Sequence, residues 1–196
     1  MKAIKWMSFV AAGLWATLML ASIVLTGSFP LRLAIRVSLN IASLVLLLIS
    51  VFGRKPALGY IGVGIKITVI VYSMARNIMI YDIRADVMYI LNVFLQEGMA
   101  LALWVLWLFA LKNKAVAIIT MVLSALLALW QFGLIASVLT SDLLGTFLRI
   151  YIGIAVDYVS VVFYYLSVAL TALWLILRKK EAVPAPEALP AAGPEL

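Results

Sequence analysis

Apolar residues run along this chain in six stretches, each long enough to cross a bilayer as a helix and separated from the next by a short polar break. The breaks contain glycine, proline, aspartate or lysine, as in the Gly-Arg-Lys-Pro segment at 53–56. We therefore predict an all-α fold, a polytopic membrane helix bundle with six transmembrane helices. The predicted spans are residues 4–26, 33–52, 57–80, 88–111, 115–139 and 152–177.

Two segments depart from this alternation. Residues 143–177 are apolar over 35 positions, which as one helix would be ~52 Å long, whereas the hydrocarbon core of a bilayer is ~30 Å thick. Either 143–151 forms a short interfacial or re-entrant helix, or the last helix protrudes. Residues 182–196 hold four of the six prolines and show no apolar periodicity. We predict a disordered cytoplasmic tail there, after a transmembrane domain at 1–181.

The distribution of Lys and Arg predicts the orientation of the bundle. With the N-terminus inside, nine basic residues flank the inner ends of the spans, and at most five lie towards the outer ends. This excess places both termini inside, which requires an even number of spans. The inner set is Lys2, Lys5, Arg54, Lys55, Lys112, Lys114, Arg178, Lys179 and Lys180; the outer set is Arg32, Arg36, Arg76, Arg84 and Arg149. We expect a multi-pass protein of the cell membrane.

Composition supports a membrane protein and excludes several classes of site. Of the 196 residues, 67% are hydrophobic and 12% charged, against roughly 45–50% and 25% in soluble domains. The chain contains neither His nor Cys, which removes metal and haem sites built on those ligands, disulfides and Ser-His-Asp catalysis. We predict no metal and no cofactor. The net charge of +7 sets topology and gives no reason to expect nucleic acid as a partner.

Two segments resemble each other and raise the question of an internal repeat. Residues 60–66 read YIGVGIK and residues 151–157 read YIGIAVD, with three identities, and Lys66 falls opposite Asp157. A repeat of three spans per half would invert the halves in the membrane, a plan common among transporters. Because apolar segments resemble one another by chance, and no other pair of spans extends the match, a 3+3 inverted repeat and coincidence both stay open.

Polar residues within the predicted spans gather on single helix faces. Arg36 and Asn40 are one turn apart, and Asp157, Ser160 and Tyr164 follow at spacings of three and four. Ionisable groups inside a bilayer are costly, so they normally face protein or water and mark function. Most of these residues fall in the outer half, which predicts an outward-facing polar cavity. The predicted substrate-binding residues are Arg36, Asn40, Lys66, Arg76, Asn92, Gln96, Glu97, Gln131, Arg149 and Asp157.

The charges of this set suggest what it would bind. Its ionisable members are Arg36, Lys66, Arg76 and Arg149 against Glu97 and Asp157, a net charge of +2. We expect ion pairs, foremost between Lys66 and Asp157 or Glu97, which leaves Arg groups for an anionic or zwitterionic solute. The alternative is a Lys–Asp pair that only locks two helices. The Ser and Thr of these faces, with Tyr164 and Tyr165, are expected to serve helix packing.

The first span carries small residues on one face. Ser8, Ala12 and Ala16 repeat every four residues, a spacing that lets a second helix approach closely, either within the chain or on another membrane subunit. In layout the chain resembles the substrate-binding membrane subunits of energy-coupling-factor vitamin transporters, which share its length, six spans and a small-x-x-x-small motif on the first helix. The resemblance covers the layout and Ala12 and Ala16, without a vitamin-specific motif. It implies uptake of a small solute with separate ATPase subunits.

Three classes of function fit these features. The first is binding or transport of a small anionic or zwitterionic solute, and the second is a non-catalytic accessory or structural subunit of a larger membrane complex. A membrane enzyme is the least favoured, because no span carries an Asp-x-x-Asp pair and no P-loop or dinucleotide-binding glycine motif occurs. A retinal Schiff base on Lys66 is disfavoured, since rhodopsins have seven spans with the lysine on the last. We therefore predict a transport protein and not an enzyme.

Overall fold

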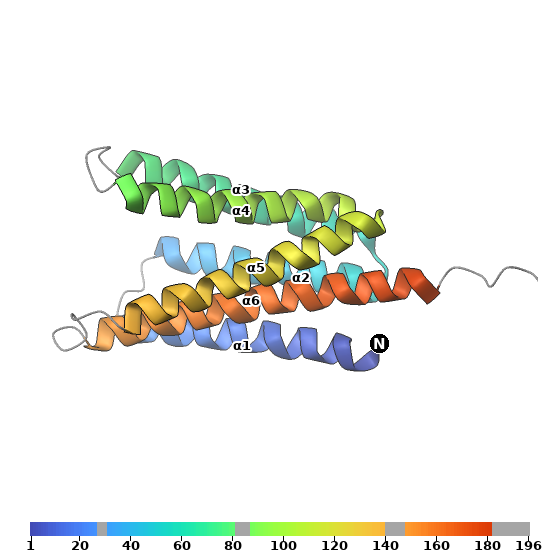
Figure 1. The fold of residues 1–196 in the computed structure, drawn as a ribbon, viewed down its shortest axis with the longest axis horizontal. Coiled ribbons are helices and arrows are strands. Elements are labelled where there is room, and N and C mark those ends of the chain that lie inside the picture. The colour runs from blue at the N-terminus through green and yellow to red at the C-terminus, as the bar shows by residue number, and fades with distance from the viewer. Residues whose placement is uncertain (27–30, 81–86, 140–147, 182–196) are drawn as a thin grey trace, which may run out of the picture.

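In a computed structural model the chain forms six helices that lie side by side along one long axis (Figure 1). They are α1 (Lys2–Thr26), α2 (Leu31–Gly53), α3 (Pro56–Ile80), α4 (Val87–Ala110), α5 (Lys114–Leu139) and α6 (Leu148–Glu181). The structure describes residues 1–26, 31–80, 87–139 and 148–181, with their side chains except at 26, 31–32, 78–80, 87–93, 137–139, 148–151 and 179–181. Within these ranges the backbone contains no strand, which confirms the predicted all-α bundle.

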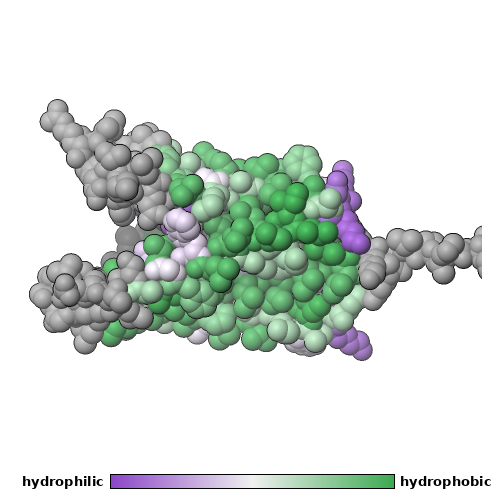
Figure 2. Space-filling view, in the orientation of Figure 1, coloured by the Kyte–Doolittle hydropathy of each residue, from purple (hydrophilic) through white to green (hydrophobic). Residues whose placement is uncertain are grey.

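The outer surface of the bundle is apolar over most of its length. Five helices contain stretches long and apolar enough to cross a bilayer: Lys2–Leu25, Leu33–Gly53, Pro56–Asn77, Lys114–Ala136 and Ile152–Arg178. In α4 the described apolar stretch is Phe94–Ala110, within a helix of 24 residues that is about 36 Å long. Figure 2 shows the apolar band, with hydrophilic residues at the end where α1 begins. The chain is thus built as a multi-pass membrane protein.

The two ends of the bundle are distinguished by where α1 begins and α6 finishes. We call the end where α1 begins the inner end, following the predicted orientation, and α6 finishes at the same end (Figure 1). There Arg54, with a φ of 58°, closes α2 in a left-handed conformation, and the amide of Lys55 donates to the carbonyl of Ser50 at 3.0 Å. Pro56 then begins α3, where its missing N–H is not needed. A single short turn therefore joins α2 to α3.

The helices close into a ring in the order α1, α6, α5, α4, α3, α2, with only sparse contacts between α2 and α1. The α1–α6 contact is the most extensive. Within it the Ser8 hydroxyl lies 2.7 Å from that of Thr171 and donates to the carbonyl of Ser167 at 3.1 Å. Ala12 and Ala16 pack against the core beside it. The small-residue face of the first span is therefore filled by α6 of the same chain.

The inner half of the ring is filled by closely packed side chains. Leu47, Trp104 and Trp107 are completely buried there. At Gly62, α3 approaches α2 so closely that a Cβ atom would lie 2.7 Å from the carbonyl oxygen of Ser43. The absence of a side chain at this glycine is what lets the two backbones meet.

The last helix decides between the two alternatives that the sequence left open for its beginning. It runs unbroken from Leu148 to Glu181 over 34 residues, about 51 Å, so 148–151 do not form a separate interfacial helix and the helix extends beyond the hydrocarbon core. Residues 143–147 and the predicted tail at 182–196 lie outside the described residues. The other predicted bounds agree within two residues. The inverted repeat stays a prediction that no feature of the fold supports.

Candidate functional site

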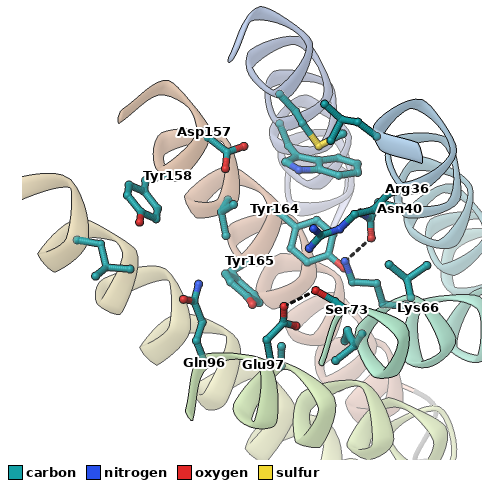
Figure 3. A pocket seen from close by; sticks show the side chains of 18 of the residues that line it. Arg36, Asn40, Lys66, Ser73, Gln96, Glu97, Asp157, Tyr158, Tyr164 and Tyr165 are labelled. Carbon is teal, nitrogen blue, oxygen red and sulfur yellow. Dashed lines mark hydrogen bonds between the residues drawn. The ribbon is translucent and has the colours of Figure 1, made fainter. Parts of the chain in front are cut away.

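A polar cavity of about 500 Å³ lies inside the ring, and all six helices contribute to its lining (Figure 3). On α1 the lining begins at Trp15, halfway along the helix, and on α2 it ends at Asn40, so the cavity occupies the outer half of the bundle. The lining residues are Trp15, Met19, Ile23, Leu33, Arg36, Asn40, Lys66, Val69, Ile70, Ser73, Asn77, Gln96, Glu97, Ala100, Leu134, Asp157, Tyr158, Val161, Tyr164 and Tyr165.

The structure brings together part of the predicted substrate-binding set. The members that line the cavity are Arg36, Asn40, Lys66, Gln96, Glu97 and Asp157. The side chains of Asn92 and Arg149 lie outside the described residues. Arg76 is exposed and is not among the lining residues, whereas the next residue, Asn77, is. Consecutive helix positions differ by about 100° in direction, which turns Arg76 away from the cavity.

Gln131 is also placed away from the cavity. Its side chain is completely buried, and neither atom of its amide has a hydrogen-bond partner among the described residues. Helix α5 contributes Leu134 to the lining instead. The periodicity of α5 groups Thr120, Ser124 and Gln131 on one face, but it does not say which neighbour that face meets. Gln131 belongs to the interior of the bundle and not to the cavity wall.

Lys66 lies at the base of the cavity and is held from two sides. Its ammonium group donates a 2.6 Å hydrogen bond to the side-chain carbonyl of Asn40, and it lies 4.5 Å from the centroid of the Tyr164 ring. An amide oxygen and an aromatic face both stabilise a cation, so Lys66 keeps favourable contacts without a carboxylate. The site is assembled across helices, because Lys66 comes from α3, Asn40 from α2 and Tyr164 from α6.

The predicted ion pair of Lys66 with Asp157 or Glu97 is wrong for the described structure. The partners of Lys66 are Asn40 and Tyr164, while Glu97 accepts a 2.8 Å hydrogen bond from the hydroxyl of Ser73. Asp157 is exposed within the cavity opening. Figure 3 shows Asp157 and Glu97 on different sides of the tyrosines. Both carboxylates therefore keep acceptor positions free for a solute.

Aromatic rings form the floor of the cavity. Tyr164 packs against Trp15 with ring centroids 5.1 Å apart, against Tyr165 at 5.3 Å and against Trp104 at 6.2 Å. The prediction that both tyrosines serve packing is incomplete, because they pack and line the cavity at once. The sequence did indicate a cavity role for Tyr164, because this residue lies on the same face of α6 as Asp157.

Other lining residues were missed as site residues for a similar reason. Ser73 and Asn77 share the helix face of Lys66, but nothing in the spacing separates a cavity residue from a packing residue. Tyr158 follows Asp157 in the sequence, and no pattern of polar spacing marks it as a cavity residue. Two hydroxyls of α6 do serve packing between helices as predicted: that of Ser167 donates to the carbonyl of Ser8 on α1 at 3.0 Å, and that of Thr171 lies 2.7 Å from the Ser8 hydroxyl.

The charge of the cavity differs from the predicted net +2. Its described lining carries two cations, Arg36 and Lys66, and two carboxylates, Glu97 and Asp157, so the formal charges balance. The difference arises because Arg76 is not a lining residue and the Arg149 side chain lies outside the described residues. A balanced set of this kind is complementary to a solute that itself carries both charges.

Comparison with protein-family models, with curated proteins and with solved structures found no match. Among the described residues, no group of His, Cys, Asp and Glu is suited to hold a metal ion.

Proposed function

We propose that this protein binds a small zwitterionic or anionic solute in the outer cavity and carries it across the cell membrane. The supporting observation is that four ionisable side chains from four different helices converge on one cavity inside an apolar bundle. Ionisable groups within a membrane span are costly unless they meet water or a partner, and they mark solute pathways in many membrane proteins. We assign these side chains to binding and not to catalysis.

The arrangement of charges favours a zwitterion. Arg36 and Lys66 would receive the acidic group of the solute, Arg36 through its planar guanidinium and Lys66 through the N–H donors that Asn40 leaves free. Glu97 and Asp157 would receive the basic group. A solute with one charge only would leave either the cations or the carboxylates uncompensated, so a molecule with both gains more from the cavity.

Transport, beyond binding, is favoured by polar atoms that lie inward of the cavity. Trp104 and Trp107 follow Ala100 by about one and two turns towards the inner end, and both are completely buried. The indole nitrogen of Trp107 and the Ser50 hydroxyl have no hydrogen-bond partner within the described part of the chain. Unpartnered polar atoms in a membrane interior are costly. We infer that they gain partners in a second state, which opens the cavity to the inner side.

Binding can be tested by thermal unfolding of the purified protein in a non-ionic detergent. Free leucine and glycerophosphoethanolamine serve as zwitterionic probes, lactate as an anion and choline as a cation. We expect the zwitterions to raise the Tm most and the cation least. Lys66→Met and Asp157→Asn should abolish this shift, whereas Lys114→Gln, which changes an exposed cation outside the cavity, should preserve it.

Transport is then tested in proteoliposomes with the probe that binds. Uptake that requires Lys66 and Asp157 would support a carrier. If none of the probes binds or is taken up, the proposal fails and the structural-subunit alternative replaces it. If a probe binds equally well to Lys66→Met, its site lies elsewhere and the outer cavity is not the binding site.

A further inference from the structure

A second hollow lies on the membrane-facing side of α2 and α3, next to the polar cavity. This lateral groove has a volume of about 460 Å³ and an apolar lining. Its wall is formed by Ile35, Arg36, Leu39, Ile65, Thr68, Val69 and Tyr72. The side chains of Ile35 and Tyr72 are 52% and 61% exposed, so the groove is open to the surroundings of the bundle, which in a membrane are lipid chains.

The lateral groove and the polar cavity share part of their walls. Arg36 and Val69 belong to the lining of both. They therefore stand at the boundary between the inside of the ring and its lipid-facing surface. The guanidinium at this boundary is the group that the proposed function assigns to the acidic part of the solute.

The position of the lateral groove follows from how α2 and α3 pack. In the inner half, Gly59 and Gly62 let the two backbones meet, and at Gly62 the carbonyl oxygen of Ser43 lies within 2.7 Å of where a Cβ atom would be. Farther out, α3 carries the larger residues Ile65 and Val69 towards α2, and the groove lies at this level. The wall of the ring is thus tight in the inner half and hollowed in the outer half.

We propose that the solute is a single-chain amphiphile with a zwitterionic head group, which enters sideways from the outer leaflet between α2 and α3. Its head group occupies the polar cavity, and its chain lies in the lateral groove. This inference rests on the proposed function and names the substrate class and the route of entry. It predicts that the chain remains in apolar surroundings while the head group crosses at Arg36.

Each part of such a molecule finds matching surroundings in this site. A lipid chain loses little when it exchanges other lipid chains for an apolar groove, since both are equally apolar. A phosphate group meets Arg36 at the boundary, and a guanidinium binds phosphate through two parallel hydrogen bonds. The amine of the head group then faces Glu97 and Asp157. A water-soluble zwitterion has no apolar chain that could occupy the lateral groove.

The test compares an amphiphile with its own head group, using the full-length protein in nanodiscs. Lysophosphatidylethanolamine is the amphiphilic probe, and glycerophosphoethanolamine is the head group without the chain. Because the nanodisc bilayer concentrates the amphiphile next to the lateral groove, we expect it to bind about tenfold more tightly than the head group at the same total concentration. A version with a photoreactive group in the chain should label α2 and α3 at the lateral groove, at residues such as Ile35, Leu39 and Tyr72.

Variants that fill the lateral groove separate the role of the chain from that of the head group. Leu39→Trp should weaken binding of the amphiphile about tenfold and leave binding of the head group unchanged. The matched control is Val45→Trp, which lies on the same helix with 45% exposure against 38% for Leu39 but outside the lateral groove. It should change neither. Thr68→Phe on the opposite wall serves as an independent block if Leu39→Trp does not fold.

The outcomes distinguish this inference from the proposed function. If the head group alone binds as tightly as the amphiphile, and both groove variants bind normally, the lateral route is wrong and the polar cavity remains the binding site. Labelling spread evenly over the lipid-facing surface would also overturn the lateral route. If neither probe binds and no other zwitterion shifts the Tm, the proposed function fails and this inference fails with it.

Discussion

Gly62 is the point at which α2 and α3 come closest, so a substitution there tests the packing that keeps the inner half closed. A Cβ atom at this position would lie 2.7 Å from the carbonyl oxygen of Ser43, 3.0 Å from the Cβ of Leu46 and 3.3 Å from the amide nitrogen of Leu47. These atoms belong to the backbone of α2 or are bonded directly to it, so no side-chain rotation relieves the contact. The Gly62→Ala variant must push the two helices apart.

The magnitude follows from two opposing effects. Overpacking of a tight contact typically costs ~1–3 kcal/mol, and the short distance to a carbonyl oxygen places Gly62→Ala near the upper end. Alanine offsets up to ~1 kcal/mol of this through its higher helix propensity. The expected net loss is therefore about 2 kcal/mol. Gly64→Ala is the matched control, because a Cβ atom there would meet nothing within 4 Å.

The assay is thermal and denaturant-induced unfolding of both variants beside the wild type in the same mixed micelles. We expect Gly62→Ala to be less stable than the wild type, and Gly64→Ala to be equal to it or more stable. Equal stability of the two variants would refute the close approach of α2 and α3 and, with it, our account of why the lateral groove is confined to the outer half.

Other predictions concern the remaining buried polar groups. Gln131→Met should raise the free energy of unfolding by about 1 kcal/mol, because it removes an unpartnered buried amide, and a loss of stability would show that the amide has partners after all. Lys66→Met and Asp157→Asn should have additive effects in the double variant, to within ~0.5 kcal/mol, since the two side chains are not paired. Recovery of stability in the double variant would reveal an ion pair. Ser8→Ala should cost about 1 kcal/mol by removing the hydroxyl bonded to Thr171, and unchanged unfolding would mean that this contact contributes nothing.

The sequence by itself determined the helices and their approximate bounds. A bilayer demands about 20 consecutive apolar residues per helix, and the polar breaks between such runs leave little freedom in where each helix ends. The depth of a residue is determined with the same certainty, because it follows from its distance along the helix. For this reason the placement of Arg36, Lys66, Glu97 and Asp157 in the outer half or near mid-depth could be read from the sequence, and all four line the cavity.

The tertiary structure alone decided the direction in which each helix face points. Periodicity groups Gln131 with Ser124 and sets Arg76 beside Asn77, but it does not reveal which neighbour a face meets. The order of the helices around the ring decides that, and it leaves Gln131 in the interior and turns Arg76 away from the cavity. The partner of Lys66 was beyond the sequence for the same reason. Charge alone favoured a carboxylate, whereas the packing of α2 against α3 brought an amide to the ammonium group, and α6 supplied an aromatic ring from across the cavity.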